Sequence, residues 1–322
     1  MPPTTTSTPE LPDTKPPGYH RILLVGLGAV AQTHLDVLAG IDNVTVAGGV
    51  DTAPRPDIQF RGRPLPTYSS LARSADDLAP TLVVVATPTS THAAVCDQVT
   101  DIFPTAEILV EKPAADNLDD ARRLLGNHDR RCPIGVAYHL RYAPEVMWGI
   151  DITRAASTSL GAPISARSIF TDPYASQIDT AMPRFGSSWL DSGINALSVL
   201  DQFIQLKERE SFRELGSTRH SVFEGRFSCG SGVESLVVTS WHVTEAAKTT
   251  SITYSCGAEL VLDHTAVAGY LRKDGGIVAL FGTDGTINRR YSHYLALYHS
   301  WLVEGHALPT AADNLRLHKL LM

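Results

Sequence analysis

A glycine-containing turn between an apolar run and an amphipathic run most limits what this chain can fold into. Residues 21–25 (Arg-Ile-Leu-Leu-Val) are followed at once by Gly-Leu-Gly-Ala-Val-Ala at 26–31 and then by helical apolar spacing. In a G-x-G-x-x-A turn, one glycine makes the bend, the next lets a pyrophosphate approach the backbone, and the small third residue lets helix and strand pack. The pattern predicts a parallel α/β domain that binds a dinucleotide at a helix N-terminus. The turn residues expected to contact the cofactor are Gly26, Gly28, Ala29 and Val30.

A second apolar run at 44–50 ends on Asp51. An acid at this place in a dinucleotide-binding domain accepts hydrogen bonds from the ribose hydroxyls and repels a 2′-phosphate. We therefore expect NAD to be preferred, although Arg55 nearby could compensate and permit NADP. Asp51 could instead be a turn residue before Pro54, because Asp often starts turns.

A third buried strand is predicted at 82–86, where the run stops at Thr87-Pro88 and a helical segment follows. The hydroxyls of the intervening Thr and Ser residues could cap that helix. Thr87, Pro88 and His92 could also lie beside the ribose and nicotinamide of a cofactor. The two roles are compatible.

The fourth run, at 106–110, stops abruptly at Glu111-Lys112-Pro113. Proline forbids further ladder pairing and biases Lys112 toward an extended backbone, which would hold its ammonium at the carboxyl edge of the sheet. The alternative is a solvated loop lysine. A fifth run, at 133–137, precedes His139. Polar or glycine residues thus follow successive strands at the edge where open α/β sheets bind ligands; they are Gly26, Asp51, Thr87, Lys112 and His139.

Beyond residue 144 the pattern changes to a helix at 145–156, a strand at 164–170 and an irregular polar and aromatic stretch at 171–188. Long stretches of this kind are usually functional or mobile, so this one could close over a substrate. The run at 189–204 has helical spacing, with one apolar face and one face that carries Asp191 and Asn195. Asp191 could simply cap this helix, or both side chains could point into a cleft.

Short strand-like segments at 221–227, 234–241, 251–255, 259–263 and 277–281 predict a mostly antiparallel meander, followed by helices at 291–303 and 310–322. An apolar outer face on such a sheet needs a partner, so a homo-oligomer, dimer or tetramer, is expected through this sheet. Trp241 could line a pocket, although an inward tryptophan in a sheet usually belongs to the core.

The composition favours a soluble, cytoplasmic protein of two domains: 322 residues, 43% of them hydrophobic and 19% charged, with a net charge of −7. The acidic balance argues against a nucleic-acid partner, and no apolar run is long enough for a membrane span. The four scattered cysteines indicate neither disulfides nor a metal site, and we expect buried thiols. Residues 1–19, rich in Pro and Thr, should be a disordered tail. The predicted domains are 20–137 (dinucleotide-binding) and 138–322 (substrate-binding and oligomerisation).

Four motifs in this order resemble the glucose–fructose oxidoreductase/inositol dehydrogenase (Gfo/Idh/MocA) family: the Gly26 turn, the segment from Thr87 to His92, Glu111-Lys112-Pro113, and Asp191-x-Gly193-x-Asn195. The resemblance covers roughly residues 21–322. It implies a Rossmann doubly wound parallel sheet, then an α+β domain whose large, mostly antiparallel open sheet faces the nicotinamide and often mediates oligomerisation. Many members have histidine where Asn195 stands and aspartate where Ser198 stands.

The segment 191–198 instead resembles the L-arabinose/D-galactose 1-dehydrogenase branch, which has an aspartate where Asp191 stands and an asparagine where Asn195 stands. The resemblance implies an NAD(P)-dependent dehydrogenase that oxidises an aldose at C1 to the aldonolactone without a metal. Asp191 would be the base, and Lys112 and Asn195 would orient the hydroxyl and stabilise the alkoxide. The cofactor would also contact Thr87, Pro88, His92, Glu111 and Lys112, and the sugar His139, Arg141 and Trp241.

Two other hypotheses stay open at this stage. Another sugar or cyclitol dehydrogenase or keto-sugar reductase of the same family would use the same Lys112 with other pocket residues. A non-catalytic sugar or nucleotide sensor is the alternative outside catalysis. The presence of both Lys112 and Asp191 favours the enzyme.

Overall fold

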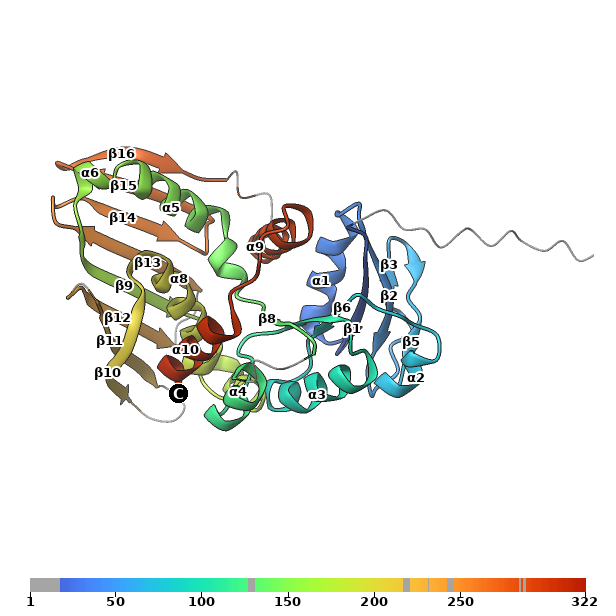
Figure 1. The fold of residues 1–322 in the computed structure, drawn as a ribbon. Coiled ribbons are helices and arrows are strands. Elements are labelled where there is room, and N and C mark those ends of the chain that lie inside the picture. Colours follow the sequence, from blue (N-terminus) through green and yellow to red (C-terminus); the bar gives the residue numbers. More distant parts are fainter. Residues whose placement is uncertain are drawn as a thin grey trace, which may run out of the picture.

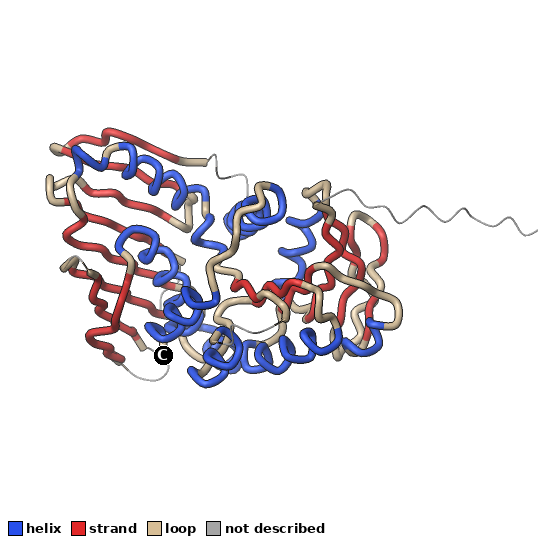
Figure 2. Tube along the Cα trace, in the orientation of Figure 1, coloured by secondary structure: helices blue, strands red, loops and turns tan. Residues whose placement is uncertain are grey.

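The computed structural model describes residues 18–126, 131–216, 221–230, 232–241, 246–283, 285 and 288–322. Each of the two halves of the chain is built on its own sheet (Figures 1 and 2). The expected N-terminal tail lies, up to residue 17, outside the described residues. Within the described ranges, no helix has the length and apolar character needed to cross a membrane.

The first sheet is parallel throughout, with the strand order β5-β2-β1-β6-β7-β8. Its strands are β1 (His20–Val25), β2 (Val44–Val50), β5 (Thr67–Tyr68), β6 (Leu82–Val85), β7 (Glu107–Val110) and β8 (Ile134–Val136). The apolar runs are continuous because both faces are covered. Ile22 and Leu24 pack on the side of α1, and Leu23 and Val25 pack on the side of α3.

The helices of this domain are α1 (Ala29–Ala39), α2 (Leu71–Ala75), α3 (His92–Ile102) and α4 (Leu118–Leu125), and a small hairpin is formed by β3 (Gln59–Phe60) and β4 (Arg63–Pro64). The strand–helix alternation and the strand order are those of a doubly wound Rossmann domain. The predicted Rossmann sheet is confirmed.

The second sheet has the order β10-β11-β12-β9-β13-β14-β15-β16 and is antiparallel except where β12 runs parallel to β9. Its strands are β9 (Pro163–Thr171), β10 (Leu206–Leu215), β11 (Val222–Cys229), β12 (Glu234–Ser240), β13 (Ala247–Tyr254), β14 (Glu259–Asp263), β15 (Ala268–Lys273) and β16 (Gly276–Phe281). The expected large, mostly antiparallel sheet is confirmed. Two of these strands, β10 and β15, are additions to the predicted meander. The mainly charged sequence of β10 hides it from a search for apolar alternation.

Helices α5 (Pro144–Ala155), α8 (Ile194–Ile204) and α10 (Ala311–Leu321) lie against one face of this sheet (Figure 1), and the short helix α6 (Ser157–Leu160) follows α5. The stretch at 171–188, predicted to be irregular, contains a 3-10 turn at Ala175–Gln177 and the helix α7 (Ile178–Phe185). Pro183 within α7 weakens the helical signal in the sequence. A π-helical turn at Trp189–Gly193 precedes α8.

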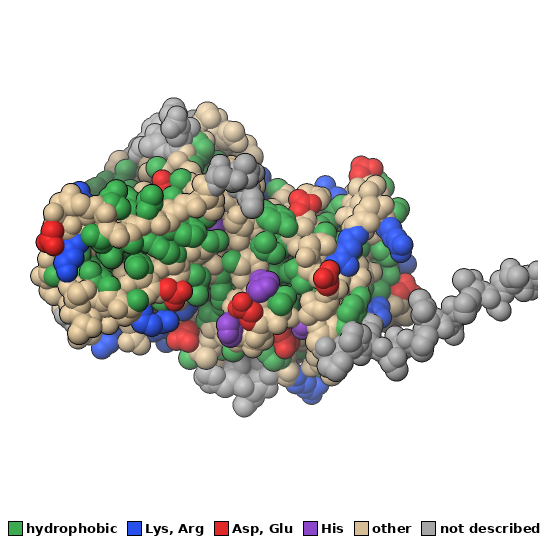
Figure 3. All heavy atoms as spheres, turned by 90° about the horizontal axis from the view of Figure 1, so that it is seen from above, with side chains coloured by type: hydrophobic (Ala, Val, Ile, Leu, Met, Phe, Trp, Pro, Cys, Tyr) green, Lys and Arg blue, Asp and Glu red, His purple; other side chains and the backbone are tan. Residues whose placement is uncertain are grey.

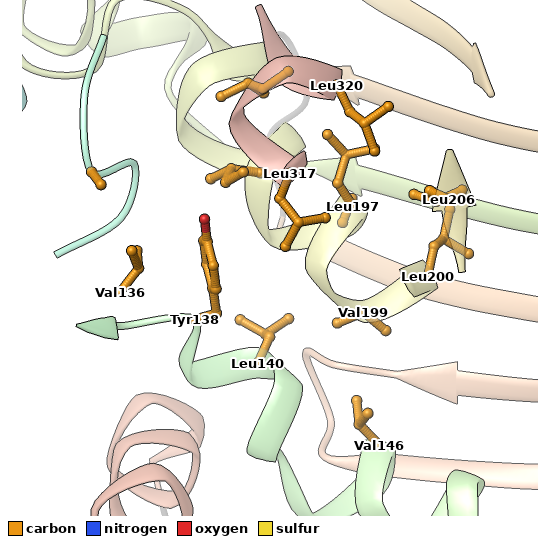
Figure 4. Close-up of a cluster of buried hydrophobic side chains, with 14 of the residues drawn as sticks. Val136, Tyr138, Leu140, Val146, Leu197, Val199, Leu200, Leu206, Leu317 and Leu320 are labelled. Atoms are coloured by element: carbon orange, nitrogen blue, oxygen red, sulfur yellow. The ribbon is translucent and has the colours of Figure 1, made fainter. Parts of the chain in front are cut away.

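The C-terminal helices return to the first domain. Helix α9 (Arg289–Tyr298) packs on α1 and continues into a π-helical turn at His299–Val303, while α10 packs on α4. Figure 4 shows Tyr138, at the end of the first domain, beside Leu197 of α8 and Leu317 of α10. A shared apolar core therefore joins the two domains behind the cleft.

Three of the cysteines, Cys96, Cys132 and Cys229, are buried as expected, but Cys256 is exposed. It lies in the turn between β13 and β14, where the chain bends at the surface. The expectation of four buried thiols is wrong at this one position.

Candidate active site

A cavity of about 270 Å³ opens between the two domains. Its walls come from the N-terminus of α1, the ends of β6 and β7, the 3-10 turn at His139–Tyr142, helices α7 and α8, strand β13 and the start of α9. The carboxyl edge of the Rossmann sheet thus faces the helices and sheet of the second domain.

The centre of this cavity is an ion pair between Lys112 and Asp191. Lys112 Nζ lies 2.8 Å from Asp191 Oδ1 and donates a second hydrogen bond of 2.8 Å to the Asp191 carbonyl. Burial favours the neutral forms, but Asp191 raises the pKa of Lys112, and Lys112, with Lys248, lowers the pKa of Asp191. Both groups are therefore charged at neutral pH.

Asp191 lies within the π-helical turn, and its carboxylate does not cap α8. Four positions later on the same face, Asn195 lines the cavity and is 4% exposed. Its Oδ1 atom is buried and has no hydrogen-bond partner among the described residues. The structure therefore brings Lys112, Asp191 and Asn195 together, as the cleft interpretation of 189–204 predicts.

A second buried ion pair adjoins the first, and the sequence interpretation missed it. Lys248 Nζ lies 2.9 Å from Asp172 Oδ1, and Ser192 donates a 2.6 Å hydrogen bond to Asp172 Oδ2. Burial lowers the pKa of Lys248, and Asp172 opposes this shift. The alternation of β13 puts Lys248 on the same inward face as Thr250 and Ile252. A lysine on a buried strand face is rare enough to have been a signal.

His139 also lines the cavity and is 8% exposed. Its ring stacks on Tyr294, with 4.6 Å between centroids, and on His293, with 5.8 Å. Burial, aided by the charge of neighbouring groups such as His293 and Lys112, holds its pKa well below the usual value, so the ring is neutral. Nδ1 is buried and finds no hydrogen-bond partner in the described part of the chain.

Two of the predicted sugar contacts, Arg141 and Trp241, lie outside this cavity. Arg141 does not line the cavity; its guanidinium faces the side-chain amide of Gln202 on α8, with Nε 2.9 Å from the amide oxygen. The 3-10 turn sends the side chains of His139 and Arg141 in different directions. Trp241 lies behind the cavity wall, packed edge-on against Tyr174 and Phe185. Its indole belongs to a small apolar cluster, which agrees with the interpretation of Trp241 as a core residue.

The glycine turn has the shape that a dinucleotide needs. Gly26 has φ +91°, and a Cβ there would lie 2.6 Å from the Ala86 backbone, so the protein itself requires glycine. At Gly28, which precedes α1, a Cβ would meet no protein atom within 4 Å. The space beside Gly28 is open for a ligand at the helix N-terminus, where a pyrophosphate fits.

Asp51 is fixed at the end of β2, where its Oδ2 accepts a 2.8 Å hydrogen bond from the Leu27 amide. It lines a second cavity, of about 600 Å³, together with Arg55 and Arg73. Arg55 Nε lies 3.6 Å from the Asp51 carboxylate. This cavity has the acid suited to ribose hydroxyls and also cations within reach of a 2′-phosphate.

The other predicted cofactor residues line the first cavity, and several hold its walls together. The Thr91 hydroxyl donates to the Pro88 carbonyl (2.7 Å) and can accept from the Thr87 hydroxyl (2.9 Å), so it closes the turn before α3 instead of capping that helix. The His92 ring lies between the carbonyls of Thr87 and Pro113.

Glu111 is bound by two residues from outside its own strand. It accepts hydrogen bonds from His34 Nε2 (3.0 Å) and the Tyr294 hydroxyl (2.6 Å). His34 Nδ1 in turn accepts from Tyr298. This network ties α1 and α9 to the end of β7.

Within the described ranges, no group of three or more His, Cys, Asp or Glu side chains is arranged to hold a metal ion. The parallel sheet, the open glycine turn and the polar cleft at the sheet edge define the chain as a dinucleotide-binding protein of the Rossmann class. Residues 20–132 match the model of the oxidoreductase family with an NAD-binding Rossmann fold. This match identifies residues 20–132 as a domain of the Gfo/Idh/MocA oxidoreductase type.

Solved structures share the fold over both domains. They include an oxidoreductase from Agrobacterium radiobacter in complex with NAD+, L-tartaric acid and magnesium (15% identity, 94% of each chain covered, TM-score 0.76). UDP-N-acetylglucosamine 3-dehydrogenase from Acidithiobacillus ferrooxidans is similar at 16% identity, covering 94% of this chain and 95% of the other, with TM-score 0.73.

Levoglucosan dehydrogenase in complex with NADH and levoglucosan is similar at 13% identity, covering 94% of this chain and 95% of the other, with TM-score 0.77. No curated protein matches the chain by sequence. At these identities the structural similarity shows the fold, and the substrate has to be argued from the site.

Proposed function

We propose that the protein is an NAD-dependent dehydrogenase that oxidises an aldose of the L-arabinose or D-galactose type at C1 to the aldonolactone. The observation that carries the proposal is the largely buried Lys112–Asp191 ion pair, in a cavity that the open Gly28 turn also borders. Such a pair supplies both a proton acceptor and a cation for developing negative charge beside a hydride acceptor.

Bound NAD would supply the hydride acceptor. The Asp191 carboxylate accepts the proton of the C1 hydroxyl. A base with a lowered pKa suffices for this step, because a hydroxyl becomes strongly acidic as the hydride leaves its carbon. The Lys112 ammonium, held by two oxygens of Asp191, directs its remaining hydrogen toward the same substrate oxygen and stabilises charge there.

Two polar atoms without hydrogen-bond partners support a sugar as the substrate. Asn195 Oδ1 and His139 Nδ1 are buried without hydrogen-bond partners in the described part of the chain, and both residues line the cavity. Buried polar groups are nearly always paired in a complete site. Hydroxyl groups of a ligand, which both donate and accept, would satisfy them.

The test is a substrate panel of aldoses, inositols and nucleotide keto-sugars with NAD and NADP, read as nicotinamide reduction or oxidation. We expect C1 oxidation of an aldose with NAD, and lactone as the product. Turnover confined to inositols or keto-sugars would contradict the oxidation of an aldose at C1 but would still show that the protein is a nicotinamide-dependent oxidoreductase. Saturable sugar binding without turnover by any member would favour the sensor.

A further inference from the structure

The charges around the active-site cavity do not balance. Among the described residues that line it, five are Lys or Arg and three are Asp or Glu, although the chain as a whole carries −7. The two lysines are accounted for, because each forms an ion pair with its own carboxylate. The third carboxylate, Glu111, is occupied by His34 and Tyr294.

The excess comes from three arginines, Arg184, Arg289 and Arg290. Within the described ranges, no carboxylate lies within 4.0 Å of any of their guanidinium groups. Arg184 lies over the ring of Phe185, 5.2 Å from its centroid. Arg289 is only partly exposed, and burial lowers its pKa, with Asp172 acting in the opposite direction. A guanidinium that is partly desolvated without a bound counter-charge would gain from an anion.

Arg289 and Arg290 are the first two residues of α9, and no acidic side chain occupies that first turn. The positive end of the helix dipole adds to their charge. Arg290 also acts on the reactive groups: burial raises the pKa of Asp191, and Lys112, Lys248 and then Arg290 lower it. Arg290 likewise contributes to the lowered pKa of His139, after burial, His293 and the lysines. Arg290, which is exposed and lines the cavity, therefore lies near enough for its charge to act on both of these groups.

We infer that the substrate carries an anionic group, a carboxylate or a phosphate ester, which Arg289 and Arg290 bind while Lys112 and Asp191 act on C1. The inference rests on the proposed function, because it names the class of aldose the site takes. A charge-assisted hydrogen bond to arginine is worth about 1.5–3 kcal/mol, or roughly 10- to 150-fold in binding. A neutral aldose would forgo this contribution.

The first experiment compares kcat/KM for D-galactose, D-galacturonate and D-galactose 6-phosphate, which share a ring and differ in charge. We expect one of the anionic sugars to exceed D-galactose by at least ~10-fold, and the advantage to shrink as salt is added. The anionic sugar with the higher kcat/KM shows whether the site takes a carboxylate or a phosphate ester. Equal values for all three would overturn the inference while leaving the proposed function standing.

Arginine-to-alanine variants test which residues bind the anionic group. Arg289→Ala and Arg290→Ala should each raise KM for the preferred anionic sugar at least ~10-fold, and the ratio of kcat/KM for that sugar to kcat/KM for D-galactose should fall by a similar factor. Arg154→Ala, which removes the same charge from an exposed site on α5, should change neither. An equal loss for neutral and anionic sugars, or a loss confined to KM for NAD, would overturn the assignment.

The anion site can also be tested by measuring the binding of ligands that the enzyme cannot oxidise at C1. Methyl β-D-galactopyranosiduronate carries its carboxylate at C6 and cannot be oxidised at C1, because its anomeric oxygen is methylated; methyl β-D-galactopyranoside is its neutral counterpart. Calorimetric titration of the NAD-loaded protein should show tighter binding of the anionic glycoside, or of methyl β-D-galactopyranoside 6-phosphate if the phosphate ester is preferred, and Arg290→Ala should abolish the difference. If neither anionic glycoside binds better than the neutral one, the inference fails whatever the enzyme oxidises. If an anionic glycoside binds through Arg290 but no sugar turns over, the proposed function fails and the anion site stands.

Discussion

Lys112 and Asp191 are 79 positions apart in the chain, yet the lysine ammonium contacts both the carboxylate and the carbonyl of the aspartate at 2.8 Å. The lysine lies two residues beyond the end of β7, and the aspartate lies in the π-helical turn before α8. This contact therefore joins the two domains at the point where the proposed chemistry occurs, in addition to the apolar core that they share. Loss of either partner would leave the other charge buried and unpaired.

The proposed base is tested by Asp191→Ala. We expect kcat to fall at least ~10²-fold, because a positioned acid–base group typically contributes ~10²–10⁴-fold, while NAD affinity stays near normal. Lys112→Ala should behave similarly, and the double variant should be little worse than the poorer single one, since both groups act on one proton. Near-native turnover by Asp191→Ala would remove it from the mechanism. Thermal melts of each variant separate a folding defect from a catalytic one.

The cofactor preference is tested at Asp51. We expect wild type to use NAD better than NADP, and Asp51→Ser to narrow or invert the ratio of kcat/KM values, because the carboxylate at the end of β2 repels a 2′-phosphate. Arg55→Ala is the opposing control: it removes a cation 3.6 Å from Asp51 and should widen the preference for NAD. A wild type that prefers NADP would refute the role given to Asp51.

The substrate role of His139 predicts an asymmetric effect. His139→Ala should raise KM for the sugar roughly tenfold, the value of one hydrogen bond of about 1.4 kcal/mol, with much less change in KM for NAD. Arg141→Ala is the comparison, because Arg141 is nearby but outside the cavity. An unchanged sugar KM in His139→Ala would make this histidine a packing partner of Tyr294.

The acid sensitivity of the fold should depend on His318 of α10. Its Nε2 accepts the Ala114 amide hydrogen (2.9 Å), and burial lowers its pKa from 6.5 to about 4. Between these values the unfolded chain binds a proton that the folded chain does not, so stability falls as pH falls from 6.5 to 4, by roughly 3 kcal/mol from this residue. Urea unfolding of His318→Gln across that range should show a shallower pH slope than wild type.

The control for this experiment is His299→Gln, which removes an exposed histidine at the end of α9. It should leave the slope unchanged. A His318→Gln variant with the wild-type slope would mean that the other buried histidines carry the acid dependence.

The outer face and edge of the second sheet should form an oligomer contact. Figure 3 shows apolar side chains gathered over the second domain, where Val278 and Leu280 of β16 are 60% and 72% exposed. Exposed apolar surface of this kind marks an interaction site. We expect a dimer or tetramer by light scattering, and Leu280→Glu should lower the mass, whereas Arg154→Glu on α5 should not. A monomeric wild type would contradict this expectation.

Much of the Rossmann domain was predictable because its signals are local. Five buried runs, each with its own polar or glycine terminus, fixed the strands and the edge where they end. The fate of a single side chain was less accessible, as Arg141 and Trp241 show. Arg141 directly follows Leu140, which lines the cavity, but the 3-10 turn directs its side chain elsewhere. Trp241 packs into an aromatic cluster outside the cavity.

The sequence by itself determined the dinucleotide turn, the succession of strands and helices in the first domain, and the candidate residues Lys112 and Asp191. These features depend on proline, glycine and apolar periodicity, which act on the backbone over only a few residues. Only the tertiary structure decided that the two side chains meet, that Lys248 and Asp172 form a second pair beside them, and that Arg289 and Arg290 reach the same cavity. These contacts join segments far apart in the chain, and packing of both domains around a shared core sets their geometry.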